Sequence, residues 1–119
     1  MTVFFPVIEL VDRYCIAKLK FDKTNANAAE LEFYKQQLSC FETQSIQFDL
    51  QHLYEIHSEI WNLESELKSG AESNLPLDEI GRRAIKIRDW NNRRIALKNT
   101  MAEKLQCNVR EIKQEHLSQ

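Results

Sequence analysis

The sequence predicts an all-α protein: a helical bundle built on a long antiparallel helical hairpin, with two shorter N-terminal helices beside it. The chain of 119 residues contains two glycines and two prolines, too few for a fold with many tight turns. Apolar residues recur at alternating spacings of four and three along four segments, as they do in helices that pack closely together. Both observations favour long helices joined by short connections.

Two short helices are predicted in the N-terminal third of the chain. The first runs from Pro6, a residue that a first helical turn tolerates, to about Phe21, and it carries Val7 and Val11 on its apolar side. The polar segment 22–27 then interrupts the pattern. A second helix over about residues 28–41 has on one side Leu31, Tyr34, Leu38 and Phe41.

Two long heptad patterns predict the hairpin. A third helix spans about residues 46–68, with Ser45 as its N-cap, and a fourth spans about residues 77–107. The connection between them is short, so the two helices should pair antiparallel, which brings Asp49 level with Lys98. The seam positions are Ile46, Leu50, Leu53, His57, Ile60, Glu64 and Leu67 on the third helix, and Ile80, Ala84, Ile87, Asn91, Arg94, Lys98, Met101 and Leu105 on the fourth.

Polar residues interrupt these apolar seams. An unpaired charge buried in a bundle costs several kcal/mol, so Arg94 and Lys98 must reach water, meet carboxylates or bind an anion. The first helix offers Glu9 and Asp12 at its start. We therefore expect Arg94 to be buried and paired with one of these carboxylates. Two plainer interpretations stay open: long side chains reach solvent from the edge of a seam, and a polar seam residue can specify register or oligomeric state.

The candidate residues for a polar network or small-anion site extend beyond this pair. Glu9, Arg13 and Lys20 share a stripe of the first helix, where an acid and a base four residues apart are ordinarily a solvated pair. Trp61 and Trp90 lie off the central seam, so they fill the flanks of the core or form a subunit interface, where tryptophan is enriched. The full set of network candidates is Glu9, Asp12, Arg13, Lys20, Glu59, Glu64, Asn91, Arg94 and Lys98.

Three segments resemble the motifs of a known family. ELVDRYCIAKLK is similar to E-L-(I/V)-D-K-x-(T/S)-I-L-x-(I/L)-K, EIWNLESEL to E-L-W-x-(I/L)-E, and NNRRIALKN to N-D-x-R-A-x-L-K. In this order, over about residues 6–105, they resemble an uncharacterised all-helical family of bacteria and of tailed phages of cyanobacteria. The resemblance implies a helical fold and supports the polar candidates, with Trp61, but it implies no activity. The chain departs from the pattern at Arg13, Cys15, Ala17 and Asn92, and the last change removes an acid beside Asn91.

Known catalytic and metal-binding patterns are absent from the sequence. Helical nucleotide pyrophosphohydrolases hold magnesium with E-x-x-E and E-x-x-D motifs on neighbouring helices, whereas Glu55 and Glu59 are misspaced and no E-x-x-D follows on the fourth helix. The chain also lacks a G-x-S-x-G motif and a glycine-rich phosphate loop. Its cysteines, Cys15, Cys40 and Cys107, are far apart and form no C-x-x-C pair. We therefore expect no catalytic residue, no metal site and no cofactor.

Charge and hydropathy limit the partners. The formal net charge is −2, although residues 82–98 hold seven of the sixteen basic residues and one acid, so we expect no nucleic-acid partner. No apolar run approaches the roughly 20 residues that cross a bilayer. The opening residues lack the basic leader of a signal peptide, which favours the cytoplasm, or a host cytoplasm for a phage-encoded chain. We assign residues 1–108 to one helical domain and 109–119 to a charged, loosely held tail.

The function that these features favour is a non-catalytic binding or adaptor module with a buried polar network or a small-anion site. Heptad seams on four helices leave more apolar surface than a thin bundle hides, which predicts a homodimer, the commonest oligomer. A protein partner or a small anionic ligand is also compatible with the pattern. The alternative is a small bundle enzyme that acts on a phosphorylated or carboxylated metabolite, or, with less support, a magnesium-dependent nucleotide pyrophosphohydrolase.

Overall fold

The structure is all-helical, which confirms the predicted fold class. The computed structural model describes residues 6–72 and 74–117, and the side chains of residues 6–69 and 74–105. Within these ranges the elements are α1 (Val7–Thr24), α2 (Ala28–Leu38), the 3-10 turn η1 (Gln44–Ile46), α3 (Gln47–Glu72) and α4 (Leu77–Leu117).

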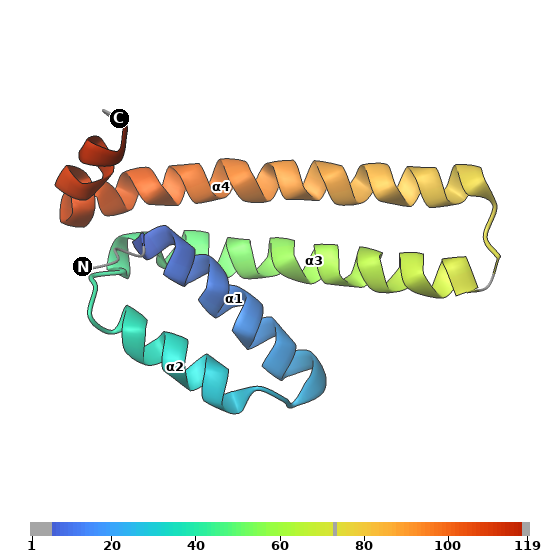
Figure 1. Cartoon of the computed structure of the whole chain (residues 1–119), viewed down its shortest axis with the longest axis horizontal. Coiled ribbons are helices and arrows are strands. Elements are labelled where there is room, and N and C mark those ends of the chain that lie inside the picture. Colours follow the sequence, from blue (N-terminus) through green and yellow to red (C-terminus); the bar gives the residue numbers. More distant parts are fainter. Residues whose placement is uncertain (1–5, 73, 118–119) are drawn as a thin grey trace.

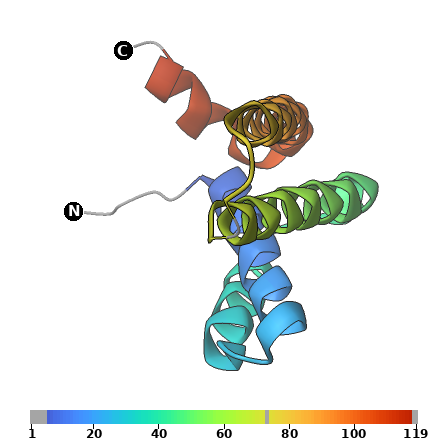
Figure 2. The ribbon, with the colours of Figure 1, turned by 90° about the vertical axis from the view of Figure 1, so that its right-hand side faces the viewer.

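The long hairpin of α3 and α4 is the frame of the molecule (Figure 1). Helix α1 lies against the half of the hairpin that is far from the α3–α4 loop, and α2 lies on the outer side of α1 (Figure 1 and Figure 2). Helix α1 contacts both α3 and α4, whereas α2 packs against α1 alone among the described helices. The half of the hairpin near its loop therefore consists of two helices without a third.

Asparagine residues separate α1 from α2. Asn25 follows the last residue of α1 with φ 58°, and Asn27 precedes α2 with φ 65°. Both angles are in the left-handed region, which asparagine tolerates better than most residues. The Thr24 hydroxyl donates to the Lys20 carbonyl at 2.7 Å, so α1 ends three residues later than the apolar pattern predicts.

Several predicted helix ends are wrong. Helix α2 ends at Leu38, and Ser45 is not an N-cap because it lies inside η1, which leads directly into α3. Helix α3 continues to Glu72 because a single glycine costs a helix only about 1 kcal/mol. Helix α4 passes Asn108 and ends at Leu117, with a bend shortly before its end (Figure 1). The last two residues of the predicted tail lie outside the described residues.

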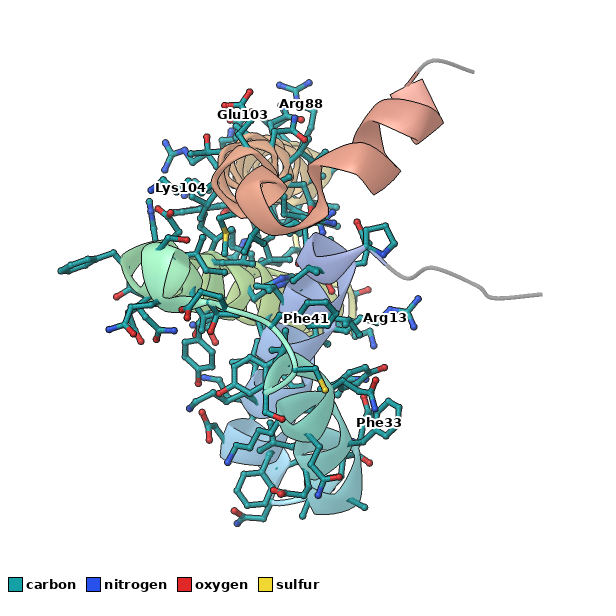
Figure 3. The ribbon with its side chains drawn as sticks, turned by 90° about the vertical axis from the view of Figure 1, so that its left-hand side faces the viewer. Arg13, Phe33, Phe41, Arg88, Glu103 and Lys104 are labelled. Atoms are coloured by element: carbon teal, nitrogen blue, oxygen red, sulfur yellow. The ribbon has the colours of Figure 1, made fainter. Side chains whose placement is uncertain are left out.

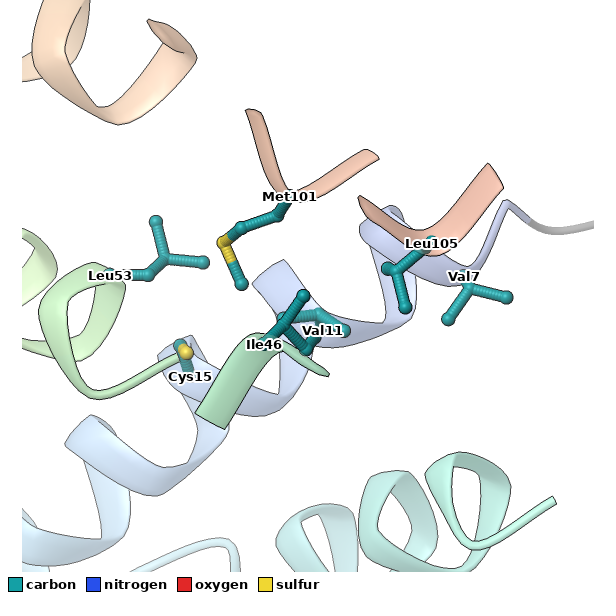
Figure 4. Close-up of a cluster of buried hydrophobic side chains, with 7 residues drawn as sticks. All are labelled: Val7, Val11, Cys15, Ile46, Leu53, Met101 and Leu105. Carbon is teal, nitrogen blue, oxygen red and sulfur yellow. The ribbon is translucent and has the colours of Figure 1, made fainter. Parts of the chain in front are cut away.

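The core lies where α1 crosses the hairpin (Figure 4). Val7, Val11 and Cys15 of α1 pack there against residues of η1, α3 and α4. Most of these positions are the predicted seam positions, because heptad spacing places them on one side of each helix. The residues that α1 meets in this cluster are Ile46, Leu53, Met101 and Leu105.

The predicted level of Asp49 is wrong. The Asp49 carboxylate binds the Lys104 ammonium at 2.6 Å, and Lys98 instead binds carboxylates of α1. Lys98 lies on the side of α4 that α1 covers, so its ammonium reaches α1 before it could reach the start of α3. Asp49 is left to pair with a lysine nearly two turns further along α4.

Candidate functional site

Asp12 is the centre of the polar network that links α1 to the hairpin. It follows Val11 in α1 and is 6% exposed. One of its carboxylate oxygens is 2.7 Å from Nε2 of His57 on α3. The other accepts hydrogen bonds from Arg94 Nη1 at 3.3 Å and from Lys98 Nζ at 3.5 Å, both on α4. One buried carboxylate thus joins three helices.

Two further residues complete the network at its edges. Glu9 lies one turn before Asp12 and accepts a hydrogen bond from Lys98 Nζ at 3.1 Å, with 41% of its side chain exposed. Asn91 lies one turn before Arg94 on α4, and its side-chain oxygen accepts from Arg94 Nε at 3.3 Å. Each basic group of the seam therefore has two acceptors from the protein itself.

The structure explains why the fourth helix carries polar residues along its seam. Asn91, Arg94 and Lys98 are at the level where α1 crosses, and α1 presents carboxylates there rather than apolar side chains. The expected ion pair between Arg94 and a carboxylate of the first helix is present, with Asp12. Arg94 is partly buried rather than fully buried, because 24% of its side chain remains exposed.

The electrostatic balance favours the charged form of Asp12. Burial alone raises the pKa of this carboxyl group, but the hydrogen bond and charge of His57, with the charges of Lys98 and Arg94, outweigh burial and lower the pKa below 3.8. An opposite charge within a few ångströms stabilises an ionised carboxylate. The network therefore contains a carboxylate that stays ionised at neutral pH, as a structural ion pair requires.

Three of the predicted site residues, Lys20, Glu59 and Glu64, do not belong to this network. Arg13 is exposed, and Lys20 is half-buried on the same side of α1. Glu59 is exposed on α3 on the side away from α1, and Glu64 is exposed beyond Asn62, which Lys23 of α1 contacts. Heptad spacing predicts which side of α3 or α4 faces a neighbouring helix. It does not predict how far α1 extends along that side, so a seam residue beyond the end of α1 stays exposed.

His57 is the functional residue that sequence reasoning missed. The seam pattern places His57 between Leu53 and Ile60 of α3, but the pattern does not identify a hydrogen-bond partner for the imidazole. In the structure His57 is 9% exposed and binds Asp12. A histidine between apolar seam residues was the signal in the sequence, because a buried imidazole needs a hydrogen-bond partner.

A second, exposed cluster fastens α1 to α3 nearby. The Tyr54 hydroxyl donates to Asp22 at 2.6 Å, and Lys18 binds the same carboxylate at 3.0 Å. The Lys18 ammonium also lies 4.9 Å from the centre of the Tyr54 ring. Burial and the bond to Asp22 raise the pKa of Tyr54 to about 12. These contacts orient α1, and the tyrosine stays protonated.

Nucleophilic and metal chemistry find little support among the described residues. Cys15 is buried, with its Sγ 3.8 Å from the Leu50 carbonyl oxygen. Burial, aided by the charge of Asp12, raises the pKa of its thiol to about 12, so the reactive thiolate is scarce at neutral pH. The described part of the chain contains no group of three or more His, Cys, Asp or Glu placed to hold a metal ion.

Comparisons with known proteins identify no relative. Family models, curated proteins and solved structures gave no match to this chain. In the described residues, no helix combines the length and the apolar character needed to cross a membrane. The network and the fold themselves are therefore the basis for a functional proposal.

Proposed function

We propose that this protein is a non-catalytic binding or adaptor module, in which the Asp12 network locks α1 and α2 onto the α3–α4 hairpin. The observation that carries the proposal is that Arg94 and Lys98 are already neutralised by Asp12 and Glu9. A small-anion site would need these cations to face a ligand. We also propose that the chain is a member of the uncharacterised helical family whose motifs its sequence resembles.

The basic segment of α4 supports a partner other than nucleic acid. Arg82 and Arg83 bind carboxylates of the hairpin, and Arg88 lies 3.5 Å from Asp89. Arg94 and Lys98 bind α1. Because most of these cations already have carboxylate partners, few remain to neutralise phosphates, which supply most nucleic-acid affinity. The proposed partner is a protein.

Anion binding separates this proposal from the metabolic-enzyme alternative. We expect inorganic phosphate and succinate to raise the melting temperature equally in the wild type and in Arg94→Met, because excluded anions stabilise any folded protein without a site. Differential scanning fluorimetry against potassium chloride at matched ionic strength measures this. An increase that occurs only in the wild type would place an anion at Arg94 and support the enzyme instead.

The second part of the proposal is a homodimer. The support for it is the apolar surface that the hairpin leaves near its loop, where Leu63, Leu67 and Trp90 are only half-buried. We expect light scattering to give twice the mass of one chain at micromolar concentration. A monomeric mass throughout the micromolar range would remove the dimer from the proposal, while the role of the Asp12 network would stand.

A further inference from the structure

The half of the hairpin near its loop has no core of its own. From Trp61 to Ser69 on α3, and from Asn74 to Thr100, none of the described side chains is buried. Buried residues resume only at Ile60 in one direction and at Met101 in the other. We call α3 from Glu59 to Ser69 and α4 from Leu77 to Arg93 the distal hairpin.

Two helices alone seldom form a stable unit, because most helical stability comes from burying an apolar face. The distal hairpin continues the heptad patterns of both helices, yet beyond Ile60 its seam residues stay half-buried or exposed, because no other helix covers them. The half-buried apolar residues of this region are Trp61, Leu63, Leu67, Ile80, Ile87 and Trp90. A further pair of helices would complete a four-helix bundle, the usual architecture for such seams.

Charge identifies the occupant as a second copy of the chain. Within the distal hairpin, residues 59–69 of α3 carry three acids and one base, whereas residues 77–93 of α4 carry five bases and three acids. A surface with one acidic and one basic helix is complementary to itself after a half-turn, as the interface of a symmetric dimer must be. An acidic or basic partner protein would match only one of the two helices.

We propose that two copies pack through their distal hairpins about a two-fold axis parallel to the helices, so that α3 of each copy lies opposite α4 of the other. This inference rests on the proposed binding function and names its partner. A two-fold axis across the helices would instead place acidic α3 against acidic α3 and basic α4 against basic α4. Like charges opposite each other disfavour that arrangement.

The docking face is the side of the hairpin opposite α1. In Figure 3, Lys104 of α4 and Arg13 of α1 project to opposite sides of the hairpin. Lys86 is 18 residues, or five helical turns, before Lys104, and therefore points to the same side. On α3, Glu59 is three turns after Phe48, which is 94% exposed. Among the described helices none covers this face, whereas α1 covers part of the other.

The face carries unpaired charges and an aromatic anchor. Glu59 and Lys86 are exposed and form no ion pair among the described residues. Between them in level lies Trp90, half-buried, with the Arg93 guanidinium 4.5 Å from its ring centre. Tryptophan and arginine are the residues that most often dominate binding energy at protein interfaces. In the proposed dimer Glu59 faces the level of Trp90 and Arg93 of the other copy, one to two helical turns from its Lys86.

Charge reversal tests this arrangement in the full chain. We expect Glu59→Lys alone, and Lys86→Glu alone, each to raise the dimer dissociation constant at least about tenfold, because each introduces two like-charge contacts per dimer. Analytical ultracentrifugation measures the constant. Glu103→Lys and Lys35→Glu are the matched controls, since Glu103 projects away from α3 (Figure 3) and Lys35 is exposed on α2. Both controls should dimerise as the wild type does.

Mixing the two single variants should restore association. In a heterodimer of Glu59→Lys with Lys86→Glu, both α3–α4 contacts between the copies again join opposite charges. We expect the mixture to form heterodimers within about threefold of the wild-type dissociation constant. A dimer that Glu59→Lys leaves unchanged, or a mixture that stays monomeric, would overturn the proposed face without affecting the role of the Asp12 network.

The direction of the axis is tested by a distance. A nitroxide on Leu77→Cys, with Cys40 and Cys107 replaced by serine and buried Cys15 retained, marks the loop end of each copy. An axis along the helices gives a label-to-label distance below about 30 Å, whereas an axis across them at the level of Trp90 separates the loops by roughly 40 Å, twice the rise of 1.5 Å per residue from Leu77 to Trp90. The longer distance by pulsed electron paramagnetic resonance would refute the axis.

Failure of this inference and failure of the proposed function give different results. A wild-type chain that stays monomeric overturns both the docking mode and the homodimer. A dimer that ignores Glu59 and Lys86 overturns the docking mode alone. Phosphate binding that depends on Arg94 overturns the non-catalytic proposal, whatever the oligomeric state.

Discussion

Replacing Arg94 by methionine is expected to lower the free energy of unfolding by about 2–3 kcal/mol. Methionine preserves the length and the apolar stem of the side chain, but it removes one of the charges that Asp12 binds. Breaking a buried ion pair costs about 3–5 kcal/mol, and an exposed pair contributes about 1 kcal/mol or less. The side chain of Arg94 is 24% exposed and that of Asp12 is 9% exposed, so the expected value lies between these limits.

A double-mutant cycle in urea separates the ion pair from simple packing. Arg94→Met combined with Asp12→Asn should cost clearly less than the sum of the two single changes, since both remove the same interaction. Arg88→Met is the control, because Arg88 is 68% exposed and its carboxylate neighbour is Asp89; we expect it to change stability by no more than about 0.5 kcal/mol. A loss below about 1 kcal/mol for Arg94→Met, with additive effects, would show that Arg94 simply reaches solvent.

Asp12→Asn is expected to have the larger effect, about 3–5 kcal/mol at pH 7. It removes the charge that His57, Arg94 and Lys98 share, and it leaves two cations of α4 partly buried with only Glu9 as a nearby carboxylate. Glu9→Gln serves as the control. The Glu9 side chain is 41% exposed, so its ion pair is largely screened by solvent and should contribute no more than about 1 kcal/mol.

The same variant should remove part of the acid sensitivity. The pKa of Asp12 is lower in the folded protein than its ordinary value of 3.8, so the unfolded chain binds the proton more readily. Its contribution to stability is therefore present above about pH 4 and is lost as the pH falls through the lowered pKa. We expect the stability difference between wild type and Asp12→Asn to shrink as the pH falls below 4. Urea unfolding at each pH measures it, and a constant difference down to pH 2 would contradict the assignment.

The faces of the helices were accessible from the sequence. Alternating spacings of four and three identify the buried sides, and Val7, Val11, Leu53, Met101 and Leu105 all lie in the core. This succeeds because periodicity is a local property of a helix, and burying an apolar stripe is the main source of its stability. The same logic predicted that charges on a seam need charged partners, which led from Arg94 to the acids of the first helix.

The ends of the helices and the reach of α1 were decided by tertiary structure. Glu64 and Arg94 both occupy seam positions, yet Glu64 is exposed and Arg94 binds Asp12, 82 residues away in the chain. The difference depends on where α1 crosses the hairpin, and no local pattern encodes that position. His57 became part of the site for the same reason, because its partner is supplied by a helix 45 residues earlier.

The sequence by itself thus determined an all-helical hairpin and the need for charge pairing on its polar seam. Only the tertiary structure decided that one carboxylate, Asp12, serves three partners, and that Ile60 is the one buried residue among the described side chains of the distal hairpin. The physical reason is the difference in range between the two kinds of information. Helix faces follow from neighbours three and four residues apart, whereas the occupant of a face is set by packing between segments that meet only in the folded chain.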